Sequence, residues 1–91
     1  MLDPLKSAKA AGLKYVSDTK PGIKRLKKGK SFKYVDESTG KTPNQEDLQR
    51  IKELVIPPAW NDVWICKDPD GHLQVTGRDA RLRKQYRYHE K

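Results

Sequence analysis

Cysteine is almost missing from this 91-residue sequence, in which Cys66 is the only one. A single cysteine excludes an internal disulfide framework and any zinc site built from several cysteines. Long apolar runs are missing as well, because no uncharged stretch approaches the roughly 18 residues that a membrane-spanning helix needs. Residues 1–12 include Asp3, Lys6 and Lys9, and they lack the apolar core of a secretory signal. We therefore expect no membrane partner and a cytoplasmic location.

The balance of apolar and charged residues favours one small domain. Apolar residues make up 34% of the sequence and charged residues 35%, so the core has to come from short apolar clusters. A chain of this length has room for a single hydrophobic core. We predict one domain over residues 1–91.

Positive charge is unevenly distributed along the chain. The 20 Lys and Arg residues outnumber the 12 Asp and Glu residues, which gives a net charge of +8. Residues 20–33 contain only basic charges and residues 77–91 are mostly basic, whereas residues 34–76 carry a net negative charge. A segregated excess of this size suggests a polyanionic partner that binds one side of the protein.

Alternating apolar and polar residues predict several strands. Val63 and Ile65 precede a turn at residues 68–71, and Leu73 and Val75 follow it, which is the pattern of a half-buried hairpin. The strands predicted in this way cover residues 13–17, 31–36, 62–67 and 72–77. Residues 83–89 also alternate, and they form either a final strand or an extended arm.

Two helices are predicted from their capping residues. A short one begins near Asp3 and ends at Gly12. A longer one covers residues 43–55, because Thr42 is a suitable cap and Gln45 completes a capping box before an apolar stripe at helical spacing. The fold class is therefore α+β, a small and mostly antiparallel sheet of about four or five strands with one or two short helices.

No group of residues forms a convincing catalytic or metal site. Gly29-Lys30-Ser31 resembles the end of a phosphate-binding loop, but Lys24 stands where that motif needs a glycine. Cys66 lies in an apolar run and is interpreted as a packed residue. We predict no catalytic residue, no cofactor and no metal for this chain.

The C-terminal basic segment combines chemical groups that suit nucleic acid. If residues 83–89 form a strand, Tyr86 and Tyr88 share one face and Gln85 and Arg87 share the other. Arginines bind phosphates, a glutamine amide bonds purine edges, and tyrosines pack on bases or bond phosphates. The alternative is an ordinary edge strand whose tyrosines belong to the core.

Four stretches carry a resemblance to a known family. They are residues 77–89, 12–23, 56–60 and 62–72, and the match depends on all four in this order. Together they resemble the N-terminal domain of bacterial, poxvirus-like type IB DNA topoisomerases. The resemblance implies a parent enzyme that relaxes supercoiled DNA without ATP through a 3′-phosphotyrosyl link. The nucleophilic tyrosine of that family belongs to a larger C-terminal domain, so no catalytic role is expected for Tyr86 or Tyr88.

The resemblance also implies how the domain binds DNA. In the family this domain is one jaw of a clamp that closes on duplex DNA through the major groove, and the Gln-Tyr-x-Tyr segment contacts the groove and backbone. Duplex DNA and the C-terminal catalytic domain are the expected partners of a monomer associated with the nucleoid. The expected DNA contacts are Lys24, Arg25, Lys27, Lys28, Lys30, Arg78, Arg81, Arg83, Lys84, Gln85, Tyr86, Arg87 and Tyr88.

Two other functions remain compatible with the sequence. Small basic α+β domains also occur as RNA-binding or ribosome-associated modules, in which case structured RNA would be preferred over duplex DNA. A third hypothesis is a structural role, in which the domain docks on its C-terminal partner and its charge only aids solubility.

Overall fold

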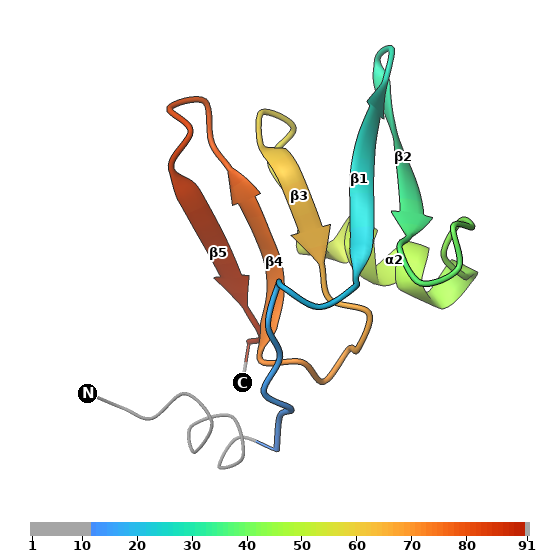
Figure 1. The fold of residues 1–91 in the computed structure, drawn as a ribbon, viewed down its shortest axis with the longest axis vertical. Coiled ribbons are helices and arrows are strands. Elements are labelled where there is room, and N and C mark those ends of the chain that lie inside the picture. The colour runs from blue at the N-terminus through green and yellow to red at the C-terminus, as the bar shows by residue number, and fades with distance from the viewer. Residues whose placement is uncertain (1–11, 91) are drawn as a thin grey trace.

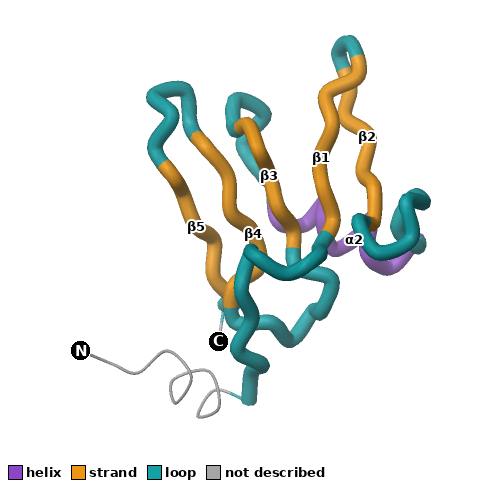
Figure 2. Tube along the Cα trace, viewed as in Figure 1, coloured by secondary structure: helices purple, strands orange, loops and turns teal. Residues whose placement is uncertain are grey.

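An antiparallel sheet with a helix against one face is formed by residues 12–90, which the computed structural model describes (Figures 1 and 2). The strands follow the order β2-β1-β3-β4-β5. This arrangement confirms the α+β prediction. The short helix predicted near Asp3 lies outside the described residues. The elements are β1 (Ile23–Lys28), β2 (Ser31–Asp36), α2 (Gln45–Leu54), β3 (Asn61–Ile65), β4 (Leu73–Arg78) and β5 (Lys84–Tyr88).

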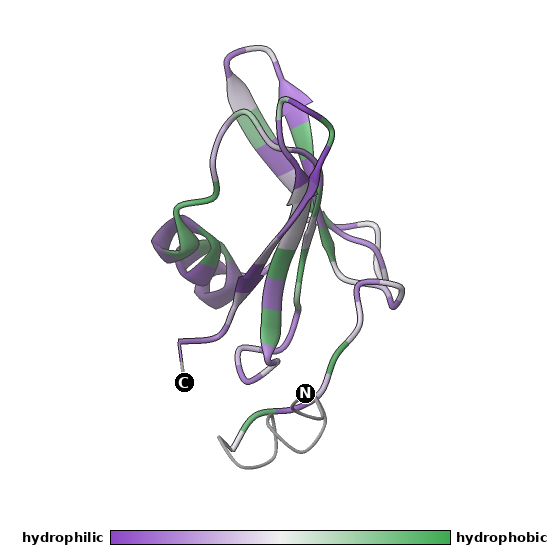
Figure 3. Cartoon of the chain, turned by 90° about the vertical axis from the view of Figure 1, so that its left-hand side faces the viewer, coloured by the Kyte–Doolittle hydropathy of each residue, from purple (hydrophilic) through white to green (hydrophobic). Residues whose placement is uncertain are grey.

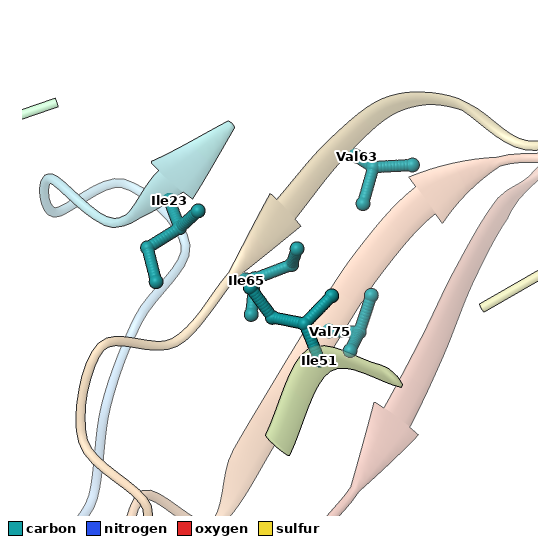
Figure 4. Packing of buried hydrophobic residues seen from close by; sticks show 5 residues of the cluster. All are labelled: Ile23, Ile51, Val63, Ile65 and Val75. Atoms are coloured by element: carbon teal, nitrogen blue, oxygen red, sulfur yellow. The ribbon is translucent and has the colours of Figure 1, made fainter. Parts of the chain in front are cut away.

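The main core lies between the sheet and α2. Ile51 of the helix packs against a buried cluster from β1, β3 and β4 (Figure 4). The β3–β4 hairpin supplies most of this cluster, as its alternating sequence predicts, but Leu73 packs in the cluster on the opposite face because the register of β4 shifts between Leu73 and Val75. Figure 3 shows α2 on one side of the sheet, while the other side carries no helix of the described chain. The other members of the cluster are Ile23, Val63, Ile65 and Val75.

A smaller cluster covers part of the opposite face. Trp64 and Cys66 are each 3% exposed and pack with Leu73 and Val16. The indole Nε1 of Trp64 donates a hydrogen bond to the carbonyl of Lys20 at 3.0 Å. The chain before β1 is thereby attached to this face, and both faces of β3 are covered, as predicted.

In the N-terminal half one predicted strand is wrong, and one strand of the structure was not predicted. Residues 13–17 do not form a strand, since Lys14 makes only an isolated parallel bridge to Gly71 and the segment otherwise packs on the sheet. The basic segment after it does form a strand, β1, which pairs with β2 and β3. Ile23 and Arg25 are buried on one face of β1. The sequence shows no apolar–polar alternation here, because one of the two buried residues is an arginine and the outward residues are mostly lysines.

The helix also begins later than predicted. Its N-cap is Asn44, whose side-chain oxygen accepts a hydrogen bond from the backbone N–H of Asp47 at 2.8 Å. Thr42 is therefore not the cap, and the helix spans Gln45–Leu54. Val55 ends it in the left-handed conformation, at φ 48°.

The two candidate caps can be distinguished by their effect on stability. Replacing Asn44 by alanine removes a bond to an otherwise unpaired helical N–H, which costs about 1 kcal/mol. We expect N44A to lower the melting temperature by about 4–8 °C. T42A serves as the matched control and should leave it within about 2 °C. A larger loss for T42A in thermal denaturation would contradict the assignment of the cap.

Candidate nucleic-acid interface

The sheet topology brings the two basic segments to the same end of the molecule. β1 and β4 are each antiparallel to β3 and therefore run in the same direction. The turn after β1, at residues 29–30, and the turn after β4, at residues 79–83, consequently lie at one end of the sheet, which we call the tip (Figure 1). β3 lies between the two strands, and where β1 pairs with it, at Ile23 and Lys24, β1 and β4 are about 10 Å apart. Lys30, Arg81 and Arg83 belong to these turns.

Strand register assigns side chains to the two faces of the sheet. Trp64 pairs with Lys24 on one side and with Thr76 on the other, and Thr76 pairs with Tyr86. Directly opposed residues point to the same face. Because Trp64 belongs to the cluster away from α2, these four residues define what we call the open face. Alternation adds further residues to it, namely Lys28, Arg78, Lys84 and Tyr88.

Tyr86 and Tyr88 face solvent and are not core residues. Their exposed fractions are 49% and 59%. Their rings are nearly parallel, with an interplanar angle of 16° and centroids 6.2 Å apart, and Lys84 Nζ lies 5.6 Å from the centroid of the Tyr86 ring. Residues 83–89 thus contain a final strand, β5, that presents two tyrosines outward. The alternative interpretation, in which these tyrosines are core, is wrong.

An acidic residue lies among the basic side chains of the open face. Asp18 Oδ2 is 2.5 Å from Lys84 Nζ. The hydrogen bond from Lys84 holds the pKa of the Asp18 carboxyl below its usual value, and a hydrogen bond with Thr76 acts in the same direction. Asp18, Asp62 and Lys84 border a hollow of about 220 Å³, together with Trp64 and other open-face residues. No local pattern in the sequence indicates this pair, because Asp18 lies in a turn more than 60 residues before β5.

Arg25 is a structural residue. Its side chain is buried and donates hydrogen bonds to the carbonyls of Ile56 at 3.4 Å, Pro57 at 2.9 Å and Trp60 at 2.8 Å. Its guanidinium also lies 4.2 Å from the centroid of the Phe32 ring. Burial lowers the pKa of this guanidinium. Because Arg25 is buried and bonds backbone carbonyls, we remove it from the candidate contacts.

Two further candidates on β5 point towards the α2 side of the sheet. Arg87 donates hydrogen bonds to the carbonyls of Leu54 and Val55, at the end of the helix. Gln85 pairs with Gly77, and its amide donates to Asp79 Oδ2 at 2.9 Å. Because side chains alternate along a strand, Gln85 and Arg87 lie on the face opposite to Tyr86 and Tyr88.

The β4–β5 turn is held in shape by Asp79. Its carboxylate accepts hydrogen bonds from the backbone N–H groups of Arg81 and Arg83, and from Nε of Arg83 at 2.9 Å. Arg78 donates to the carbonyl of Leu82 at 3.1 Å across the same turn. The side chain of Arg81 is left exposed at the tip. At the same end of the sheet, the β1–β2 hairpin carries exposed Lys27, Lys28 and Lys30.

Cysteine chemistry, a metal site and a membrane-spanning helix were also considered for the described residues. Cys66 is buried, as predicted, and burial raises the pKa of its thiol. Among residues 12–90, no group of three or more His, Cys, Asp or Glu side chains could hold a metal ion. No helix in that same part of the chain is long and apolar enough to cross a membrane.

Comparison with known proteins identifies the family. A family model described as the N-terminal domain of bacterial DNA topoisomerase IB matches residues 31–79, which is more than half of the chain. The DNA topoisomerase 1B of Acanthamoeba polyphaga mimivirus is 44% identical over 69 residues. That segment is 76% of this chain and 20% of the viral protein. The chain belongs to the N-terminal domain family of bacterial type IB topoisomerases, which confirms the resemblance noted in the sequence.

The matched region covers only part of the candidate interface. It extends from β2 to the residue after β4, and so includes Arg78. The basic strand β1 and the tyrosine-bearing strand β5 lie outside residues 31–79. The roles of Lys84, Tyr86 and Tyr88 therefore rest on their geometry and on the sequence resemblance of residues 77–89.

The structural role of Arg25 can be tested by unfolding. In R25M the side chain keeps its apolar stem but can no longer donate to the backbone carbonyls of Ile56, Pro57 and Trp60. Hydrogen bonds from a charged group contribute about 1.5–3 kcal/mol, so we expect a loss of about 2 kcal/mol in urea denaturation. K28M, which changes an exposed lysine of the same strand, should stay within about 0.5 kcal/mol. Equal losses for the two variants would contradict this role.

Proposed function

We propose that this chain binds duplex DNA through the open face and the tip, as the N-terminal domain of a type IB topoisomerase. The observation that carries the proposal is that each of the two basic segments places a turn, residues 29–30 and residues 79–83, at the same end of the sheet. Lysine and arginine side chains that converge on one surface neutralise phosphates and release counterions. The relative from mimivirus is named a DNA topoisomerase, which supports DNA as the polyanion.

The proposed contacts differ from the set expected from the sequence. Lys24, Lys28, Arg78 and Lys84 would meet the DNA from the open face, and exposed Lys27, Lys30, Arg81 and Arg83 from the tip. Tyr86 and Tyr88 would contact the backbone or base edges beside them. Arg25 and Arg87 are left out because backbone carbonyls occupy their guanidinium groups. Gln85 points to the α2 side of the sheet, and its amide already donates to Asp79 Oδ2.

The role within a complete enzyme follows from this binding. The domain would hold one side of the duplex while a separate catalytic domain, with its nucleophilic tyrosine, nicks and reseals one strand. Since this chain spans a fifth of its viral relative, most of such an enzyme would lie in sequence beyond it. Binding of this kind would place the protein on the nucleoid as a monomer, with the other domain as its partner.

Salt dependence tests whether both basic segments contact DNA. With about four to six phosphates neutralised, the logarithm of the association constant should fall with the logarithm of salt concentration at a slope of about −4 to −5. The double variant K28A/R81A removes one exposed positive charge from each of the two basic segments. We expect its slope, measured by fluorescence anisotropy with a labelled duplex, to be smaller in magnitude by about 2.

A second double variant controls for net charge. K41A/K52A removes two exposed lysines that lie in the loop before α2 and on the helix itself. Its slope should equal that of the unchanged protein. A flat salt response, or equal effects of the two double variants, would contradict the proposed surface. Preference for an RNA hairpin over duplex DNA in direct competition would favour the RNA-binding function instead.

Asp18 should weaken DNA binding, because it is an anion paired with a proposed phosphate contact. D18N removes its charge and frees the ammonium group of Lys84. We expect a duplex affinity about two- to tenfold higher at fixed salt, measured by the same anisotropy titration. D70N is the matched control, since Asp70 is exposed in the β3–β4 turn at the end opposite the tip. An unchanged affinity in D18N would show that Lys84 does not contact the duplex.

A further inference from the structure

Four aromatic rings from separate segments form a connected row on the open face. The rings of Tyr86 and Tyr88 are near neighbours on β5. The Tyr88 ring lies 6.2 Å from the ring of His72, and His72 is stacked on Tyr15 with centroids 4.7 Å apart and an interplanar angle of 13°. We call these four residues the aromatic row.

The row is fixed by backbone hydrogen bonds near its centre. His72 Nδ1 accepts from the backbone N–H of Val16 at 3.1 Å. The backbone N–H of His72 donates to the carbonyl of Lys14, and its carbonyl accepts from the N–H of His89, both at 2.8 Å. The segment before β1, the start of β4 and the end of β5 are thus joined at one residue. A ring surface that is ordered beforehand loses little conformational freedom when a ligand stacks on it.

The exposure of the row indicates a ligand. Tyr15 is 52% exposed, and the two tyrosines of β5 are exposed to a similar extent. These rings therefore contribute little to the core, and large apolar surfaces that cluster outside the core usually mark a binding site. Lys84 Nζ lies over the Tyr86 ring, so a cation is present at one end of the row.

We propose that the aromatic row stacks the unpaired bases of a single nucleic-acid strand. Bases in a duplex already stack on each other and present only their edges to a protein, whereas unpaired bases offer flat faces. A row of exposed rings beside a cationic surface is the arrangement by which proteins hold single strands. The inference goes beyond the proposed duplex binding, because Tyr15 and His72 lie outside the proposed duplex contacts.

Tyr15 separates the two activities. The 91-residue chain is titrated with labelled dT10 and with a labelled DNA hairpin at the same low salt concentration. Loss of one stacked base costs about fivefold to a hundredfold in affinity. We expect Y15L to weaken dT10 binding within this range and to change hairpin binding by less than about twofold, whereas Y15W, which keeps a ring, should restore dT10 binding.

Two controls test whether the effect of Y15L comes from the loss of any exposed side chain or from a folding defect. L26A truncates a side chain of β1 that is 50% exposed on the same face but away from the row, and it should leave dT10 binding unchanged. Upfield NMR shifts of the ring protons of Tyr15, Tyr86 and Tyr88 on addition of dT10 report stacking directly in the unchanged protein. Binding of U10 with the same loss in Y15L would also support stacking, and would show that the sugar is not read.

Three results would overturn the inference. They are the absence of ring-proton shifts with dT10, equal losses of dT10 binding in Y15L and L26A, and equal losses of dT10 and hairpin binding in Y15L. Failure of the duplex proposal is a separate result, because it would appear as weak hairpin binding with normal dT10 binding. The ring-proton shifts need no variant, so the test holds even if Y15L does not fold.

Discussion

Burial of one sheet face against α2 is the constraint on which the rest of the structure depends. Arg25 secures it from the sheet side, since its guanidinium bonds three carbonyls of the segment that leads from α2 to β3. A buried cation is stable only where hydrogen bonds replace its water, and here those acceptors belong to the chain that the helix leads into. Alternate side chains of each strand point to this covered face, and the remaining side chains form the open face.

The strand order then decides where the positive charge gathers. β1 lies inside the sheet between β2 and β3, and it runs in the same direction as β4. The basic turns that follow β1 and β4 therefore lie at the same tip, although an acidic stretch separates them in the sequence. Like charges that converge in this way repel each other, and the structure offsets part of that repulsion with Asp18 and Asp79, each of which pairs with a basic residue of β5 or of the turn before it. These two ion pairs thus hold the basic surface in shape without a ligand.

Much of the fold follows from local patterns, whereas the site depends on which face the helix covers. Strand 31–36 and the β3–β4 hairpin could be predicted because their alternation is clear, with shifts of one or two residues at the hairpin ends. β1 could not, because its buried face carries Arg25 and no second long apolar side chain beyond Ile23. Residues 13–17 contain apolar residues that pack on the sheet without pairing along it. Asn44 and Thr42 are both good caps, and only the backbone path distinguishes them.

The candidate contacts could be proposed from the sequence as basic segments. The side chains of Arg25 and Arg87, however, point to the α2 side of the sheet, and only the three-dimensional register shows which side that is.

β5 connects the two proposed properties of the open face along a single strand. Lys84 begins the strand at the tip, and Tyr88 ends it beside His72, about 13 Å away for four steps of an antiparallel strand. Charge is therefore concentrated at one end and aromatic surface at the other. Electrostatic attraction acts over several ångströms and depends on salt, whereas stacking needs direct contact and depends on it much less. A nucleic acid that meets this face would be attracted first at the tip, and it could gain contacts along the aromatic row only where its bases are free to leave their own stack.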